Sequence, residues 1–286
     1  MRSTKKTEQI SLQKAETCKR IKNLEKEGRF EEDILKDASA KELLPNQVDY
    51  LSKKFSTRMK TRTANLIADR YFLRQIKKGK LLIDGIEGEE YLSALANGAV
   101  VTCNHFSIFD HYIVFHCIRK YLPKKYLYKV IKEGNYTSFG GLFGFFMRHC
   151  NTLPLSRNRR TMMNFTSAVQ TLLKRGETVL VYPEQSMWPN YPKPRPFKAG
   201  AFKMAYRAGV PVLPVFITMQ PSGKIDKKTG EELQKYTVHC LPPVYPDFSL
   251  GEKLGAQEMG EVSYQSCKAQ FEKTYGKPLV FCEENA

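Results

Sequence analysis

His105 and Asp110 are the residues whose types and spacing could carry acid–base chemistry. They follow Ala99–Cys103, an apolar run that predicts a short buried strand, and a loop and a helix are expected after it. On one helix, residues five apart would lie about 140° apart around the axis, so the pair could not share a face. They can meet if His105 lies in the loop and Asp110 in the first turn of the helix, where the carboxylate would fix the imidazole tautomer. A capping Asp beside an unrelated His is the alternative.

No protein nucleophile accompanies this candidate base. The sequence has no Gly-x-Ser-x-Gly elbow, and the glycines of Gly140–Gly144 lack the Lys-Ser/Thr of a phosphate-binding loop. We therefore expect the nucleophile to belong to a substrate, for example a hydroxyl group. Arg157 follows a predicted strand and precedes a helix, so it could bind a phosphate or could simply be solvated.

The charge of the chain predicts an anionic partner. Lys and Arg number 46 against 29 Asp and Glu, a formal charge of +17. Between Gln47 and Lys80 there are ten basic and two acidic residues, so this segment alone carries 10 − 2 = +8. Nucleic acid, an anionic membrane surface or a phosphorylated substrate would all fit. We expect no nucleic acid, because the cations are not interleaved with a stacking platform of aromatics and no nucleic-acid-binding motif is present.

The seven cysteines are widely spaced and form no Cys-x-x-Cys pair, which argues against a disulfide framework and a zinc site and favours a reducing cytosol. No signal peptide is visible, and no apolar stretch reaches the ~18 residues of a spanning helix. We expect a cytoplasmic protein that meets membranes only from the side.

The first 79 residues are expected to form a helical, basic region. Helices are predicted over 7–27 and 29–44, and a basic amphipathic helix over 47–78 with an apolar stripe that begins at Val48, Leu51 and Phe55. Such a helix can lie in a lipid interface with its cations on anionic head groups. The same stripe could instead pack on the body of the protein, and periodicity does not decide between the two.

From residue 80 onward, strands and helices alternate. Strands are predicted over 81–83, 99–103, 126–131, 152–155, 178–182 and 212–218, with an edge strand over 236–241; helices are predicted over 89–96, 108–120, 139–147, 160–175, 198–208 and 256–275. This order predicts an α/β domain over 80–286, with a mostly parallel sheet flanked by helices on both faces and preceded by the N-terminal helical basic arm.

Four ordered segments resemble the sequence blocks of the glycerolipid acyltransferases, the family that includes 1-acylglycerol-3-phosphate acyltransferase. Asn104-His-Phe-Ser-Ile-Phe-Asp110 is similar to the Asn-His-x-x-x-x-Asp block. The later blocks correspond to Pro154-Leu-Ser-Arg157, Tyr182-Pro-Glu184 and Val210-Pro-Val-Leu-Pro-Val215, and Phe197-Lys-Ala-Gly200 resembles the Phe-Lys-x-Gly after the third block. The resemblance spans about Leu81 to Pro246.

This resemblance implies transfer of a fatty acyl group from a thioester, acyl-CoA or acyl carrier protein, to a hydroxyl of a lysophospholipid. His105 would be the base and Asp110 its partner, while Asn104, Arg157, Glu184 and Lys198 would bind or position the acceptor. No metal or cofactor is implied. The alternatives are the same chemistry on glycerol-3-phosphate or another lipid acceptor, and a basic membrane-binding module without turnover.

The third block departs from the family. Gln185-Ser-Met187 stands where the family usually has Gly-Thr-Arg, so an arginine is missing. Lys193, Arg195 or Lys198 is expected to supply the lost charge.

Overall fold

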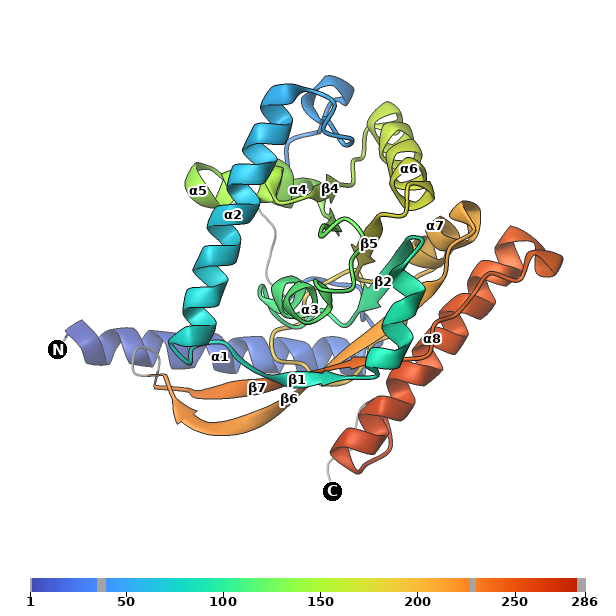
Figure 1. The fold of residues 1–286 in the computed structure, drawn as a ribbon. Helices are drawn as coiled ribbons and strands as arrows, with labels where there is room; N and C mark the ends of the chain where they lie inside the picture. The colour runs from blue at the N-terminus through green and yellow to red at the C-terminus, as the bar shows by residue number, and fades with distance from the viewer. Residues whose placement is uncertain (1, 35–39, 227–229, 282–286) are drawn as a thin grey trace.

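A seven-stranded sheet forms the centre of the protein (Figure 1). The computed structural model describes residues 2–34, 40–226 and 230–281 of the chain, with side chains from Lys14 onward. The strand order is β1-β7-β6-β2-β5-β3-β4. The strands are β1 (Leu82–Glu87), β2 (Ala99–Cys103), β3 (Leu127–Ile131), β4 (Thr152–Pro154), β5 (Thr178–Val181), β6 (Val212–Ile225) and β7 (Glu232–Cys240).

The sheet is mostly parallel, as the alternation of strands and helices predicts. Strands β2 to β6 run in one direction, β7 pairs antiparallel with β6, and β1 pairs parallel with β7. The strand predicted over 236–241 forms as part of β7, but the prediction that it lies at an edge of the sheet is wrong. Strand β6 continues to Ile225 and pairs along its length with β7, whose other side is covered by β1.

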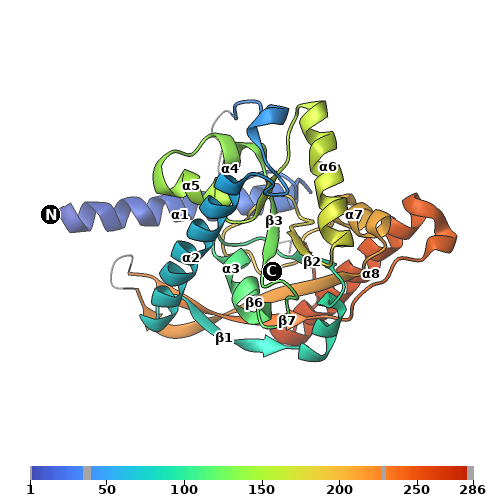
Figure 2. The same ribbon diagram turned by 45° about the horizontal axis from the view of Figure 1, so that its top comes forward.

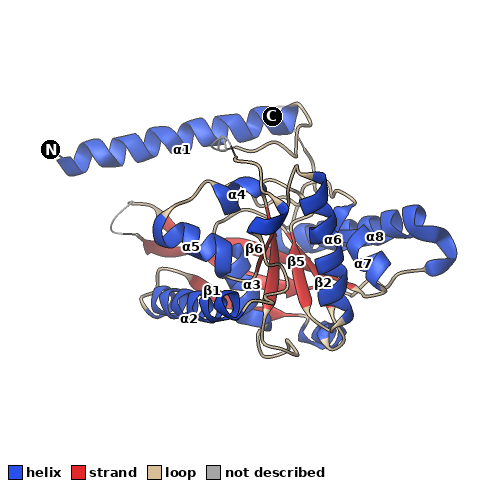
Figure 3. Ribbon diagram, turned by 90° about the horizontal axis from the view of Figure 1, so that it is seen from above, coloured by secondary structure: helices blue, strands red, loops and turns tan. Residues whose placement is uncertain are grey.

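Helices cover both faces of the sheet. They are α1 (Arg2–Lys26), α2 (Phe55–Lys77), α3 (Asp110–Ile118), α4 (Glu133–Thr137), α5 (Gly141–His149), α6 (Arg159–Lys174), α7 (Gly200–Ala208) and α8 (Gly251–Tyr275), with short 3-10 turns η1 (Pro45–Gln47), η2 (Glu89–Leu95) and η3 (Phe248–Leu250). Figure 3 shows α3 on one side of the central strands and α6 and α7 on the other.

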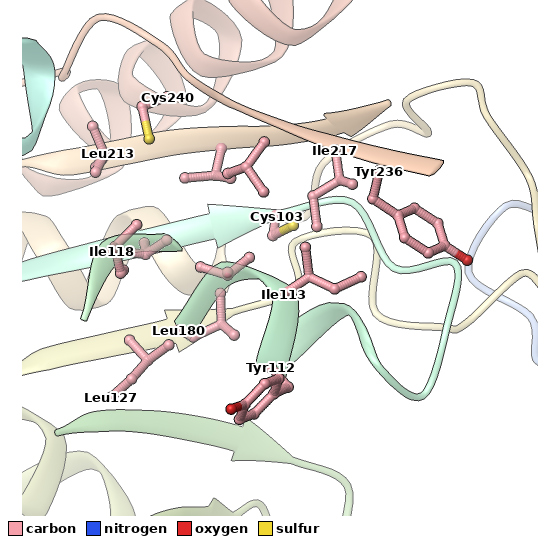
Figure 4. Close-up of a cluster of buried hydrophobic side chains, with 14 of the residues drawn as sticks. Cys103, Tyr112, Ile113, Ile118, Leu127, Leu180, Leu213, Ile217, Tyr236 and Cys240 are labelled. Carbon is pink, nitrogen blue, oxygen red and sulfur yellow. The ribbon is translucent and has the colours of Figure 1, made fainter. Parts of the chain in front are cut away.

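Alternation along β2 places its side chains in two separate cores. Ala99, Val101 and Cys103 join the cluster under α3, together with Ile113 and Leu180 (Figure 4). Val100 points the other way, into the cluster formed with α6, α7 and α8. A strand buried on both faces needs a continuous apolar run, which is the pattern that Ala99–Cys103 has.

The N-terminal region differs from its prediction in two places. No helix forms in residues 29–34 or 40–44, and 35–39 lie outside the described residues. The amphipathic helix begins at Phe55 rather than Gln47, because Asp49 accepts hydrogen bonds from the amides of Lys53 and Lys54 and so turns the chain just before the helix. Figure 2 shows the N-terminal end of α1 projecting from the body, with α2 beside α5.

Helix α2 divides its apolar stripe between the two predicted environments. Phe72 and Ile76 pack against the core, while Phe55, Leu66 and Ile67 are among the exposed large side chains. Among the described residues, no helix is both long and apolar enough to cross a membrane. Six of the seven cysteines lie in this part of the chain and are free; Cys282 lies outside it.

Candidate active site

The candidate site lies where the central parallel strands end. Thr102 of β2 is in register with Val181 of β5, so the residues that follow the two strands lie side by side. The carboxyl ends of β3 and β4 meet at the same edge. Open parallel sheets place their binding crevices at this edge, and all the polar candidates except Lys198 come from segments that directly follow these strands.

His105 and Asp110 meet as a loop-to-helix junction requires. Asp110 is the first residue of α3, and its Oδ2 lies 2.7 Å from Nδ1 of His105. The same oxygen accepts the amides of Phe106 and Ser107, at 3.3 and 3.2 Å. A carboxylate that accepts from Nδ1 leaves Nε2 unprotonated in the neutral ring, and 22% of the His105 side chain is exposed.

Tyr182, the residue directly after β5, supports this pair. Its hydroxyl donates to Oδ1 of Asp110 at 2.6 Å, so both carboxylate oxygens are bonded. Its ring stacks on the imidazole of His105, with centroids 3.9 Å apart and planes 14° from parallel. The imidazole is therefore held both at its Nδ1 edge and on one face.

The electrostatics of the pair favour an ionised carboxylate. Burial would raise the pKa of Asp110, but the charge of His105 and hydrogen bonds from His105 and Tyr182 outweigh burial and hold that pKa below its usual value. Burial, with the charge of Lys129, lowers the pKa of the neighbouring His111 to about 4. Asp110 hydrogen-bonds the ring of His105 and not that of the neighbouring His111, so geometry singles out His105.

Asn104 and Glu184 lie beside His105 but are buried. The Asn104 side chain continues the ladder from β2 to β6, donating to the carbonyl of Ile217 at 3.0 Å and accepting its amide at 2.9 Å. Glu184 accepts the amide of His105 at 3.1 Å and pairs with Nη2 of Arg195 at 2.7 Å. Both side chains therefore bind other parts of the protein and fix the backbone around His105.

Arg157 lies at the end of β4 and is anchored by Glu133. Its Nε donates to Oε2 of Glu133 at 3.0 Å, and Nη2 donates to the carbonyl of Ala40 at 2.9 Å, yet 71% of its side chain is exposed. Burial opposes ionisation of Glu133, but hydrogen bonds from Leu43, Ser156 and Arg157 keep the pKa of its carboxyl below the usual value. Arg157 thus presents a fixed cation at the strand-end edge.

The three cations expected downstream of the third block separate in the structure. Arg195 is completely buried against Glu184. Lys193 bonds Glu25 of α1 at 2.7 Å and the carbonyl of Val280. Lys198 is half-exposed, with its Nζ 3.5 Å from Glu31. Of the three, Lys198 is the one open to an acceptor.

Sequence reasoning gave no role to Glu133 and none to the Tyr182 hydroxyl. The role of Tyr182 could have been suspected from the sequence, since the family usually has phenylalanine at the start of this block. The role of Glu133 could not, because the amide that it binds, that of Leu43, is 90 residues away in the sequence. In the described residues, no cluster of three or more His, Cys, Asp or Glu could hold a metal. A hollow of about 260 Å³ is lined by other residues, among them Tyr50 and His149.

Comparison with known proteins gives the family of this site. Residues 85–218 match the family model described as Acyltransferase, a range that contains every block from Asn104 to Val215. These residues, somewhat less than half of the chain, are similar to that family. The resemblance of the chain to the glycerolipid acyltransferases is thereby confirmed.

Three proteins similar to this chain are named 1-acyl-sn-glycerol-3-phosphate acyltransferase. The Chlamydomonas reinhardtii protein is 29% identical over 163 residues, 55% of this chain and 46% of the relative. The chloroplastic proteins of Brassica napus and Arabidopsis thaliana are 31% and 32% identical over 148 residues, 51% of this chain and 40% and 38% of theirs. The matched region therefore spans less than half the length of these relatives.

The fold of this chain is also similar to that of a solved structure. The crystal structure of the 1-acyl-sn-glycerophosphate (LPA) acyltransferase, PlsC, from Thermotoga maritima is similar with a TM-score of 0.50 and 20% identity, covering 81% of this chain and 87% of that one. At this identity the likeness establishes the α/β fold.

Proposed function

We propose that this protein transfers a fatty acyl group from a thioester to the hydroxyl of a lysophospholipid such as 1-acylglycerol-3-phosphate. The observation that carries the proposal is the 2.7 Å bond between His105 and Asp110 at the strand-end edge, which leaves Nε2 of His105 to accept a proton. The similar proteins named 1-acyl-sn-glycerol-3-phosphate acyltransferase support this acceptor class. Acyl-CoA and acyl carrier protein remain the two proposed donors, and no cofactor is invoked.

In the proposed reaction, Nε2 of His105 removes the proton of the acceptor hydroxyl while that oxygen attacks the thioester carbonyl. Collapse of the tetrahedral intermediate breaks the carbon–sulfur bond, and the imidazolium returns its proton to the leaving thiolate. Asp110 stabilises the imidazolium and Tyr182 holds Asp110. The ester bond forms as the thioester bond breaks, and no atom changes its oxidation state.

Arg157 and Lys198 are proposed to bind the phosphate of the acceptor. Arg157 is exposed yet fixed by Glu133, and a fixed guanidinium suits bidentate contact with phosphate oxygens. Lys198 precedes α7 and has its ammonium half-exposed. Asn104 and Glu184 are proposed to act by holding the site together, because their side chains are buried and bonded to protein.

Incubating purified protein with acyl-CoA and a panel of lysolipids, including glycerol-3-phosphate, would identify the acceptor by mass spectrometry of the products. We expect His105→Ala to lower turnover about 10²–10⁴-fold, the usual contribution of a general base, with an unchanged circular dichroism spectrum. His149→Ala is the matched control and should retain turnover. Wild-type turnover in His105→Ala would refute the base, and no thioester consumption with any acceptor would favour the binding module.

We also propose that residues 1–79 serve as a surface anchor for the acyltransferase domain at 80–286, on an anionic membrane. Helix α2 exposes Phe55, Leu66 and Ile67, and α5, packed beside it, exposes Leu142 and Phe143. Helix α2 also carries Lys and Arg residues, and each of these contributes about 1 kcal/mol of binding free energy near an anionic surface. Exposed apolar groups flanked by cations are the composition of an interfacial helix.

Vesicle sedimentation tests this anchor. We expect binding to vesicles that contain an anionic phospholipid, weaker binding at high salt, and little binding to purely zwitterionic vesicles. The variant Leu66→Ser/Ile67→Ser should lose binding. Leu254→Ser, which alters an even more exposed apolar residue on α8, should not. Equal losses in both variants would contradict the anchor.

A further inference from the structure

A buried arginine, Arg195, contacts the main chain of His105 from inside the protein. The side chain of Arg195 is almost completely buried, although it carries a charge that water would solvate strongly. It belongs to the irregular segment between β5 and α7, eleven residues after Glu184, and no arginine occurs between the two. A charge buried this deeply has to be explained by the groups that it contacts.

One side of Arg195 holds Glu184 and the main chain of His105. Nη2 lies 2.7 Å from Oε2 of Glu184 and 3.4 Å from the carbonyl oxygen of His105. The Arg195 amide donates to Oε1 of Glu184 at 2.9 Å, and Oε2 accepts the His105 amide at 3.1 Å. The amide and the carbonyl of His105 are thus both bonded to this buried pair.

The other side of Arg195 holds the loop and the N-terminal segment. Nη1 donates to Oγ of Ser186 at 2.6 Å and to the carbonyl of Phe30 at 2.7 Å, while Nη2 also donates to the carbonyl of Ser186. The guanidinium carbon lies 4.7 Å from the centre of the Trp188 ring. One planar side chain therefore joins three segments that are far apart in the sequence.

These contacts exclude a role in acceptor binding. A guanidinium this deeply buried cannot reach a phosphate, and Nη1 and Nη2 already donate to protein groups. Stability alone is a weak reason for the pair, because desolvation of a buried ion pair offsets much of its attraction and apolar replacements often stabilise as well. An apolar pair would leave the His105 amide without its acceptor, and it would remove one of the two donors to the His105 carbonyl, the other being the amide of Trp188 at 3.0 Å.

We propose that Arg195 is a positioning residue for the reaction: through Glu184 and the His105 main chain, it sets the direction of Nε2 of His105. Arg195 is the positively charged partner of Glu184, because residues 185–187 carry no positive charge. The inference rests on the proposed function for its kinetic readout. A misplacement of a reacting group by about 1 Å can lower the rate on the order of 10²-fold, so the effect belongs to kcat.

The kinetic test compares Arg195→Lys, Arg195→Met and Glu25→Gln. Lysine keeps the charge opposite Glu184 but cannot also reach Phe30 and Ser186, so we expect kcat to fall about 10-fold with lysine and about 100-fold with methionine, with KM for both substrates nearly constant. Glu25→Gln breaks the pair with Lys193 in the same loop without touching His105, so its kcat should stay at the wild-type value.

Three results would overturn the proposal. A raised acceptor KM with unchanged kcat would make Arg195 a phosphate ligand. A normal kcat per folded molecule in both Arg195 variants would show that Arg195 only stabilises the fold. An equal loss of kcat in Glu25→Gln would show that any disturbance of this loop lowers kcat. If the methionine variant does not fold, the lysine variant and its kcat-to-KM pattern decide.

A second readout separates this inference from the proposed function. In protein with labelled histidine, the Nε2 and backbone amide resonances of His105 should shift in Arg195→Lys and stay in place in Glu25→Gln. If wild-type protein transfers no acyl group, the proposed function fails, and the resonance shifts alone then support or refute positioning by Arg195. Unshifted His105 resonances in Arg195→Lys would refute it.

Discussion

At the scale of single residues, Tyr182 is where this chain adds a contact to its site. The family usually has phenylalanine here, whereas the tyrosine hydroxyl donates to Asp110 at 2.6 Å. Burial, together with the charge of Asp110, raises the pKa of Tyr182 well above its usual value, so the hydroxyl stays a donor throughout the physiological range. The stacked ring and the hydroxyl together restrict the imidazole of His105.

Tyr182→Phe isolates this hydroxyl because it keeps the ring. We expect a loss of about 1.5–3 kcal/mol in the free energy of unfolding, the usual value for a hydrogen bond to a charged group. Acyl transfer should fall less than in His105→Ala, because phenylalanine still stacks on the imidazole. Urea denaturation and steady-state kinetics measure both. Unchanged stability would mean that the hydroxyl contributes nothing to holding Asp110.

Asp110 predicts how stability depends on pH. Its pKa is lower in the folded protein than the value of about 3.9 in an unfolded chain, so folding favours the ionised carboxylate. This contribution is fully present above about pH 4 and is lost as the pH falls through the lowered folded pKa.

Wild-type protein should therefore lose more stability between pH 5 and about pH 2–3 than Asp110→Asn, which has no carboxyl to titrate at this position. Urea unfolding across this range measures the difference. Parallel curves for the two proteins would contradict the linkage.

At the scale of elements, the site depends on how strand ends are fixed. Strands β2 and β5 bring the His105 and Glu184 loops together through their parallel register, and Asn104 ties the first of these loops to β6. At the edge of the sheet formed by β1, this strand ends at Glu87, and the chain turns at Gly88 against the end of β7. A tight approach at this turn fixes the outer part of the sheet.

Gly88→Ala should be strongly destabilising. Gly88 has φ of +75°, and a Cβ there would lie 2.0 Å from the carbonyl oxygen of Cys240, so the backbone of one strand end must move. We expect a loss of more than about 2 kcal/mol in thermal or urea unfolding, from backbone strain plus overpacking.

Gly85→Ala is the control for this turn, because a Cβ at Gly85 meets open space and its φ is not positive. Its stability should change by less than about 1 kcal/mol. Similar losses in the two variants would show that strand β1 tolerates no side chain at either position.

At the scale of the whole molecule, the N-terminal arm and the site share one small core. Ile21 and Leu24 of α1 and Ile34 pack with Trp188 and Tyr191 from the loop between β5 and α7. Trp188 is completely buried, and its Nε1 donates to the carbonyl of Glu32 at 2.8 Å. The loop that carries Arg195 is therefore closed on its outer side by the N-terminal segment.

Trp188→Ala should loosen the arm as well as the loop. We expect a loss of about 3–5 kcal/mol in the free energy of unfolding, the usual cost of removing a buried tryptophan. Hydrogen exchange should become faster in residues 21–34. Tyr245→Ala, at an exposed aromatic, is the control and should change neither quantity. Unchanged exchange in residues 21–34 would show that the arm does not depend on this core.

What the sequence by itself determined depended on local patterns. The bounds of β2 are those predicted, because a run buried on both faces is apolar at every position, and the His105–Asp110 contact was predicted because it spans only five residues. The apolar periodicity also placed α6 and α8 within a few residues of their observed bounds.

Tertiary structure decided what depends on partners far along the chain. The segments at 29–34 and 40–44 have helix-forming residues, yet Phe30 and Ile34 pack on Trp188, and the Leu43 amide bonds Glu133. Contacts with residues more than 80 positions away therefore override local propensity there. The position of β7 between β1 and β6 and the choice of Arg195 among three downstream cations have the same origin. Spacing can propose a buried partner for a charge, but only the packed chain determines which cation loses its water.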